Sequence, residues 1–135
     1  MSDNTRPGGE DGRTGIILLY HGSAGNEWMA HMEWMAGAVR DAIPSASVLS
    51  ACLKEFPPSL EDSVSSLAAG GAESILVVPM FIGPGGHALR DFPPIIESMK
   101  NRWPHIRFTW TPVAGAWEEV AEAVARGIGA RLDGK

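Results

Sequence analysis

The chain has 135 residues, 44% of them hydrophobic and 20% charged, which is the composition of one globular domain. A chain of this length buries about two-thirds of its unfolded surface and needs neither disulfides nor structural zinc to fold. Sixteen acidic and eleven basic residues give a net charge of −5 with no basic cluster, which argues against a nucleic-acid groove. Cys52 is the single cysteine, so an internal disulfide is excluded and a reducing, cytoplasmic location is expected.

The N-terminal segment 1–13 is rich in glycine and charged residues and has no apolar stretch. It therefore predicts a disordered tail rather than a signal peptide. The longest apolar run, from Ile75 to Ile82, is shorter than the roughly 18 residues of a membrane-crossing helix, and Pro79 interrupts it. We expect one domain over residues 14–135 and no membrane span.

From residue 15 onward, short β-branched segments alternate with longer amphipathic segments, which predicts four β-α units. The first expected helix has apolar residues at helical spacing and ends before Pro44, and the second begins with a capping-box pattern at Ser59. The expected strands are 15–21, 46–53, 74–81 and 106–111, and the first two helices are about 25–42 and 59–69.

The third helix is expected to begin late in its segment. Asp91 can cap it, while Pro93 and Pro94 fit a first turn, where N–H groups have no helical partner. This leaves His87 on a loop. The last helix is expected over 117–132 with one apolar stripe, formed by Val120, Val124 and Ile128.

Right-handed crossovers between these units favour a doubly wound α/β domain, with a four-stranded parallel sheet in the order 2-1-3-4 flanked by helices. Ligands bind such sheets beyond the carboxyl ends of the strands, near the point where the strand order reverses. That point lies here between the first and third strands.

Two histidines follow these two strands. His21 closes the first strand and His87 lies after the third, so the topology places both imidazoles at one edge of the sheet. A neutral imidazole binds a divalent metal or accepts a proton near neutral pH. Each histidine alone could cap backbone groups instead, but two at one edge favour a site.

Ser23 lies two residues after His21 and is interpreted first as a helix cap and second as a hydrogen-bonding group for a ligand. A serine nucleophile is disfavoured because the first glycine of G-x-S-x-G is absent. Phosphohistidine enzymes carry arginine where Tyr20 stands, which disfavours phosphoryl transfer.

The glycine-rich segment 83–86 lacks the Lys-Ser/Thr end of a phosphate-binding loop. Gly85 and Gly86 are better suited to letting a large planar ligand approach the backbone. Arg90 is the nearest permanent cation.

The remaining candidates have structural interpretations. His31 and His105 are expected at the surface, and Cys52 as a buried, unreactive thiol. Core or dimer packing is expected for the five tryptophans, Trp28, Trp34, Trp103, Trp110 and Trp117.

Three motifs occur in order: the first strand ending in Leu18-Leu19-Tyr20-His21-Gly22-Ser23, then Val77-Val78-Pro79-Met80-Phe81-Ile82, then G-x-H-x-x-x-D-x-P from Gly85 to Pro93. Together they resemble the short form of sirohydrochlorin cobaltochelatase, a class II chelatase, over about residues 15–103. The resemblance implies a homodimer that encloses one tetrapyrrole and inserts Co²⁺, or Fe²⁺ or Ni²⁺, into sirohydrochlorin. The metal is then a substrate, and no permanent cofactor is expected.

The resemblance also implies that His21 and His87 bind the metal and accept protons. Glu55 is a further candidate metal ligand, because Lys54 stands where the family usually has an acidic residue. Lys54 itself is expected to pair with a carboxylate of the ring. The expected substrate-binding residues are Ser23, Lys54, Gly85, Gly86 and Arg90.

Two other functions stay open at this point. One is a non-catalytic module that binds metal or tetrapyrrole on a chelatase lobe and has lost turnover together with the acidic residue. The other is a phosphate-handling hydrolase that uses His21 and the segment 83–86.

Overall fold

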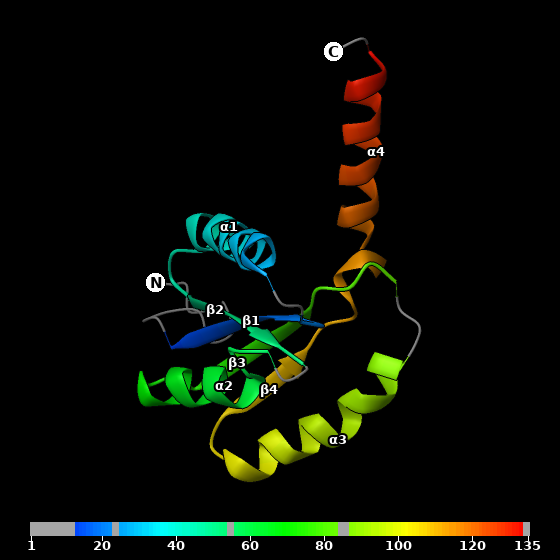
Figure 1. Ribbon diagram of the computed structural model, residues 1–135. Coiled ribbons are helices and arrows are strands. Elements are labelled where there is room, and N and C mark those ends of the chain that lie inside the picture. The colour runs from blue at the N-terminus through cyan, green and yellow to red at the C-terminus, as the bar shows by residue number, and fades with distance from the viewer. Residues whose placement is uncertain (1–12, 23–24, 54–55, 84–86, 134–135) are drawn as a thin grey trace.

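The computed structural model describes residues 13–22, 25–53, 56–83 and 87–133 (Figure 1). The segment 1–12, for which disorder is predicted, lies outside these residues. No helix within the described ranges is long and apolar enough to cross a membrane.

The described strands form one parallel sheet in the order β2-β1-β3-β4, as predicted. Its strands are β1 (Thr14–Tyr20), β2 (Ser47–Cys52), β3 (Ser74–Pro79) and β4 (Arg107–Trp110). Each strand ends one or two residues before the carboxyl end of its expected range, which is the usual uncertainty of strand boundaries. β1 and β3 are neighbours at the centre, so the strand order reverses between them.

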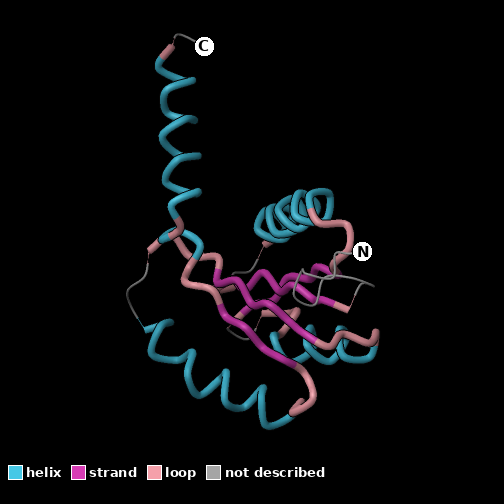
Figure 2. The backbone as a smooth tube through the Cα atoms, turned by 180° about the vertical axis from the view of Figure 1, so that it is seen from behind, coloured by secondary structure: helices cyan, strands magenta, loops and turns pink. Residues whose placement is uncertain are grey.

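Helices cover both faces of the sheet (Figure 1). On one face lies α1 (Asn26–Ala42), and on the other lie α2 (Leu60–Ala69) and α3 (His87–Arg102). A short 3-10 turn, η3 (Ala114–Ala116), leads from β4 into α4 (Glu118–Leu132). Figure 2 shows from the opposite side that α4 extends away from the sheet.

The alternation of side chains along β1 divides the core in two. Ile17 and Leu19 are fully buried against α2 and α3, whereas Ile16 and Leu18 pack towards α1. β1 is buried on both faces, as expected of a central parallel strand. On the α1 side, Ala36 is the helix residue with no exposed surface.

The second helix has the predicted boundaries. The Ser59 side chain accepts a hydrogen bond from the Asp62 N–H (3.0 Å), which caps α2. The helix ends at Gly70, and Gly71 follows with a φ of 96°, a backbone conformation that favours glycine. Arg102 of α3 forms an ion pair with Glu61 and links the two helices of this layer.

The late start predicted for the third helix is wrong, because α3 begins at His87 and Pro93 and Pro94 lie inside it. A proline inside a helix removes a backbone hydrogen bond. Local sequence preference therefore placed the start of the helix at Asp91, with both prolines in the first turn. The apolar face overrides this preference. Phe92 and Met99, seven residues apart, are both buried against the sheet.

The last helix has the predicted range, but its apolar stripe is not buried. No residue of α4 is buried, and Val124, Ile128 and Leu132 are 56%, 54% and 79% exposed. The predicted stripe therefore exists as one side of the helix, and it is exposed in the single chain. The Gly115 N–H of η3 donates to the Phe81 carbonyl oxygen (2.8 Å) just after β3, and from there α4 extends away from the sheet (Figure 2).

Candidate active site

Strand pairing continues past the ends of the strands at the carboxyl edge. The Met80 N–H donates to the Leu19 carbonyl oxygen (2.7 Å), and the Leu53 N–H donates to the Tyr20 carbonyl oxygen (2.8 Å). The segments that follow β1, β2 and β3 therefore leave the sheet side by side. This edge, at the reversal of strand order, is where a ligand is expected in a doubly wound sheet.

His21 lies at this edge and is exposed, although Tyr20 before it is only 2% exposed. Gly22 follows with a φ of 107°, so the chain turns sharply immediately after the histidine. The buried strand thus fixes the backbone that precedes His21, and the imidazole of His21 is open to solvent.

The segment after β3 leads from the same edge to His87, the first residue of α3. The prediction that His87 lies on a loop is therefore wrong, for the reason given for α3. Its side chain lies outside the part of the chain that the structure describes. Arg90, in the first turn of α3, is exposed.

The other predicted site residues, Ser23, Lys54, Glu55, Gly85 and Gly86, lie outside the described residues. The N-cap residue of α1 is Gly25, whose φ of 120° favours glycine, rather than Ser23. Leu53, whose N–H pairs with β1, comes directly before Lys54. Within the described ranges, no three His, Cys, Asp or Glu side chains lie close enough together to hold a metal ion.

Aromatic side chains adjoin this edge on the α1 side, and the sequence analysis had not grouped them. Tyr20 meets Trp28 edge to face with ring centroids 5.6 Å apart, and His31 stacks on Trp28 at 5.7 Å. Trp34 lies 5.5 Å from His31 and is exposed, so of the two predicted roles, core or dimer packing, the core role is wrong for this residue. The spacing 28, 31 and 34 along one flank of a helix was the available signal.

Burial changes the acid–base properties of two groups beside the site. Burial raises the pKa of Tyr20 to about 12, with a smaller contribution from Cys52. Burial also raises the pKa of the Cys52 thiol, so this thiol is the unreactive group that the sequence predicted. His31 and His105 are exposed, also as predicted.

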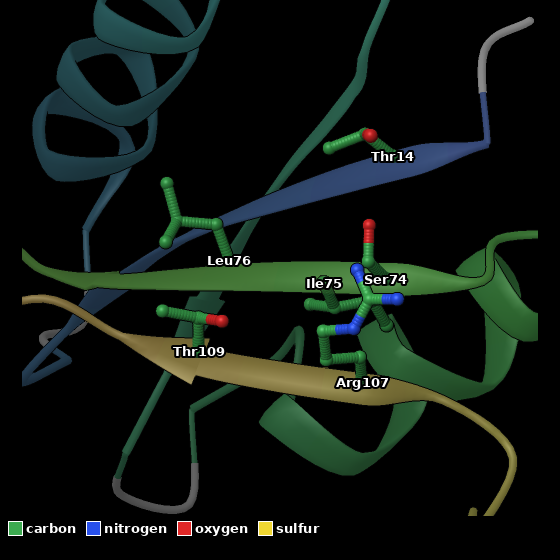
Figure 3. A pocket seen from close by; sticks show the side chains of 6 residues that line it. All are labelled: Thr14, Ser74, Ile75, Leu76, Arg107 and Thr109. Atoms are coloured by element: carbon green, nitrogen blue, oxygen red, sulfur yellow. The ribbon is translucent and has the colours of Figure 1, made fainter. Parts of the chain in front are cut away.

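Two hollows lie away from this edge. One, of about 270 Å³, is at the amino end of the sheet between β1, β3 and β4 (Figure 3). The other, of about 240 Å³, lies between α1 and the region of β2, and Met32 and Arg40 are among its lining residues. Neither contains the candidate histidine.

A parallel sheet that reverses its strand order beside an exposed histidine places this chain among doubly wound α/β proteins, a class in which ligands bind beyond the carboxyl edge of the sheet. The chain belongs to the CbiX family, whose sequence profile matches residues 15–130. The resemblance read from the motifs is therefore confirmed.

Named relatives agree with this family. The sirohydrochlorin cobaltochelatase of Saccharolobus solfataricus is 31% identical over 125 residues, covering 84% of this chain and 92% of that protein. The one of Sulfurisphaera tokodaii is 29% identical, covering 80% and 85%. The chain spans only 26% of the length of the 32% identical cobaltochelatase of Priestia megaterium, where 57% of this chain is matched.

Solved structures share the fold. A cobalamin (vitamin B12) biosynthesis CbiX protein from Marinobacter aquaeolei VT8 superposes with a TM-score of 0.78 at 26% identity, covering 90% of this chain and 99% of that one. The sirohydrochlorin chelatase SirB from Bacillus subtilis subspecies spizizenii, in complex with cobalt, gives a TM-score of 0.74 at 24% identity. That comparison covers 87% of this chain and 50% of the SirB chain.

Proposed function

We propose that this protein is a chelatase that inserts a divalent metal into sirohydrochlorin. The observation that carries the proposal is the position of His21, exposed at the reversal of strand order in a CbiX-family sheet. Two relatives that match this chain over most of their own length are named sirohydrochlorin cobaltochelatases. Cobalt is accordingly the proposed metal, with iron or nickel as other substrates of the same site.

Metal insertion requires a donor set that releases the metal and a group that accepts protons. One M²⁺ replaces two pyrrole protons, so the net charge of the macrocycle does not change. A neutral imidazole nitrogen binds the arriving ion while leaving coordination positions open for the ring nitrogens. After the ion has moved to the ring, the same nitrogen can accept a released proton. His21 and His87 have these roles in the proposal.

The remaining proposed residues hold the substrate. Carboxylates of the ring pair with Lys54 and Arg90, while Ser23 donates a hydrogen bond and Gly85 and Gly86 let the ring approach the backbone. Glu55 is proposed as a further metal ligand, next to Lys54 where the family usually has an acid. The active form is proposed to be a cytoplasmic homodimer, because one small lobe covers only one face of a tetrapyrrole.

The test follows the visible spectrum of sirohydrochlorin with Co²⁺ without oxygen, using catalytic amounts of protein. Wild type is expected to metallate many rings per site, and His21→Ala and His87→Ala to fall close to the uncatalysed rate. His105→Ala is the matched control, since His105 is exposed and lies in the turn before β4. Activity that survives in both site variants would refute the roles of the two histidines.

Lys54 favours a second candidate, a module that binds metal or tetrapyrrole without turnover. A spectral change that saturates at one ring per site, with no further turnover, would identify this module. The Lys54→Glu variant then shows whether the absence of an acidic side chain explains the lack of turnover. Turnover that appears in this variant, and is absent in wild type, would mean that the missing acid had abolished catalysis.

A further inference from the structure

Three polar side chains form one row across the amino end of the sheet. The strand register pairs Thr14 of β1 with Ser74 of β3, and Ser74 with Arg107 of β4. Residues that pair directly point to the same face, and neighbouring strands lie about 4.8 Å apart, so two hydroxyls and a guanidinium lie next to one another over about 10 Å. Figure 3 shows these side chains around the hollow of about 270 Å³, with the Arg107 side chain extending towards Ser74.

The next row on the same face is largely apolar. Ile16, Leu76 and Thr109 pair with one another across β1, β3 and β4. Ile16 is buried and Leu76 half-buried in the core beneath α1, whereas Thr109 is exposed. The hollow therefore has a polar end with one positive charge and an apolar floor at Leu76.

The backbone that carries the polar row is ordered before the strands begin. The Glu73 N–H donates to the Arg13 carbonyl oxygen (2.8 Å), and the Arg107 N–H donates to the Glu73 carbonyl oxygen (3.0 Å). The spacing of the row is therefore fixed without a ligand, which lowers the entropy that binding must remove.

The polar row has hydrogen-bonding capacity that the described part of the chain does not use. The Thr14 hydroxyl oxygen is buried and has no hydrogen-bond partner among these residues. Buried polar groups nearly always have a partner, and an exception often marks a bound water or ion. Arg107 forms no ion pair with another described residue, because the adjacent Glu73 carboxylate pairs with Arg13 instead. The charge of Arg107 is thus available to an anion.

We propose that this hollow binds a small organic carboxylate that carries an apolar group. The planar guanidinium of Arg107 donates two parallel hydrogen bonds to the carboxylate, and the Ser74 hydroxyl donates a third, while the apolar group lies on Leu76. A single guanidinium matches one negative charge, which favours a carboxylate over a phosphate monoester with nearly two. A hollow of about 270 Å³ is slightly smaller than a typical ligand pocket of roughly 300–1,000 Å³, so the ligand is small.

This site lies at the opposite end of the sheet from the site proposed for metal insertion. Thr14 and Tyr20 are the two ends of β1, so the polar row is about 20 Å from His21, which follows Tyr20. Binding of the carboxylate requires neither His21 nor a metal. The inference therefore goes beyond the proposed function, and either can fail while the other holds.

The test records amide NMR spectra of the full chain at pH 7 during titration with hexanoate, acetate and hexan-1-ol. Hexanoate is expected to shift the signals of residues 14–16, 74–76 and 107–109 along one saturable curve. Acetate lacks the apolar chain and hexan-1-ol lacks the charge, so each is expected to bind at least fivefold more weakly. Hexan-1-ol that binds as tightly as hexanoate would overturn the proposal, and so would shifts that do not saturate or that lie only elsewhere in the chain.

Charge variants test the same site from the side of the protein. Arg107→Gln keeps a long polar side chain without the charge and is expected to weaken hexanoate binding at least fivefold. Arg126→Gln, at an exposed position of α4, is the matched control and is expected to bind hexanoate as wild type does. Equal affinities of Arg107→Gln and wild type would refute the proposal.

Two further measurements separate binding from folding and from metal insertion. Ser74→Ala is expected to weaken hexanoate binding about threefold while its free energy of unfolding in urea stays within 1 kcal/mol of wild type, about the value of one neutral hydrogen bond. Arg107→Gln is expected to metallate sirohydrochlorin at the wild-type rate, because the polar row lies far from His21. A Ser74→Ala variant that binds hexanoate as tightly as wild type would contradict the role of its hydroxyl.

Discussion

Tyr20 is the only tyrosine in the chain, so its ionisation can be followed by phenolate absorbance without overlap from another tyrosine. Burial raises its pKa from 10.0 to about 12, which means that the folded state favours the neutral phenol. On unfolding, the phenol ionises at its ordinary pKa. The unfolded state therefore binds fewer protons than the folded state above about pH 10, and stability falls with rising pH.

A shift of this size corresponds to roughly 2–3 kcal/mol of folding free energy. That stability is present in full below about pH 10 and is lost progressively as the pH rises through about 12. Tyr20→Phe should remove this part of the pH dependence. Because the Tyr20 hydroxyl is buried without a hydrogen-bond partner among the described residues, the variant should be as stable as wild type near neutral pH, or more stable by about 1 kcal/mol.

The assay is urea unfolding at a series of pH values from 8 to about 12, with the phenolate absorbance of the native protein titrated in parallel. The wild-type curve should fall below the Tyr20→Phe curve as the pH rises above 10. A native phenolate titration centred near 10, or two parallel stability curves, would refute the burial argument.

Three other predictions concern the sheet and its edge. Leu19→Ala, at a fully buried position of β1, should destabilise the fold by about 2–5 kcal/mol in urea unfolding; a loss below 1 kcal/mol would mean that the site is not packed. Gly115→Ala should displace η3 and cost several kcal/mol, because the added Cβ meets the Ile82 backbone; an unchanged melting temperature would contradict that contact. Cys52 should react with a thiol reagent only at the rate of unfolding, and fast labelling of native protein would disprove its burial.

The sheet could be predicted because its determinants are local. Runs such as Ile16 to Leu19 are apolar on both faces, which marks a covered central strand, and short connections with right-handed crossovers leave few strand orders. The start of α3 could not be predicted in the same way. Pro93 and Pro94 argue locally for a late start, while the opposing term, burial of Phe92 and Met99, depends on the assembled sheet.

The edge of the sheet that carries the candidate site was also predictable, since His21 directly follows β1 and the topology fixes where that residue lies. The aromatic contacts from Tyr20 to Trp34 were not, because they require the angle between α1 and the strands. The exposure of the α4 stripe could likewise not be predicted from the sequence. A stripe read from the sequence shows that a helix needs a partner, and it does not show whether that partner belongs to the same chain.

The hydrogen bonds that extend the sheet past β1 also bear on the metal exchange proposed for His21. The carbonyl groups of Leu19 and Tyr20 are both engaged by neighbouring segments, so the backbone is ordered up to the residue that precedes His21. Folding has already removed the main-chain freedom of these two residues, so an ion bound by His21, as proposed, would restrict chiefly the two side-chain torsions of the histidine. Such a donor loses little entropy when it captures a metal and regains little when it releases one, which suits a ligand that must pass its ion on rather than keep it.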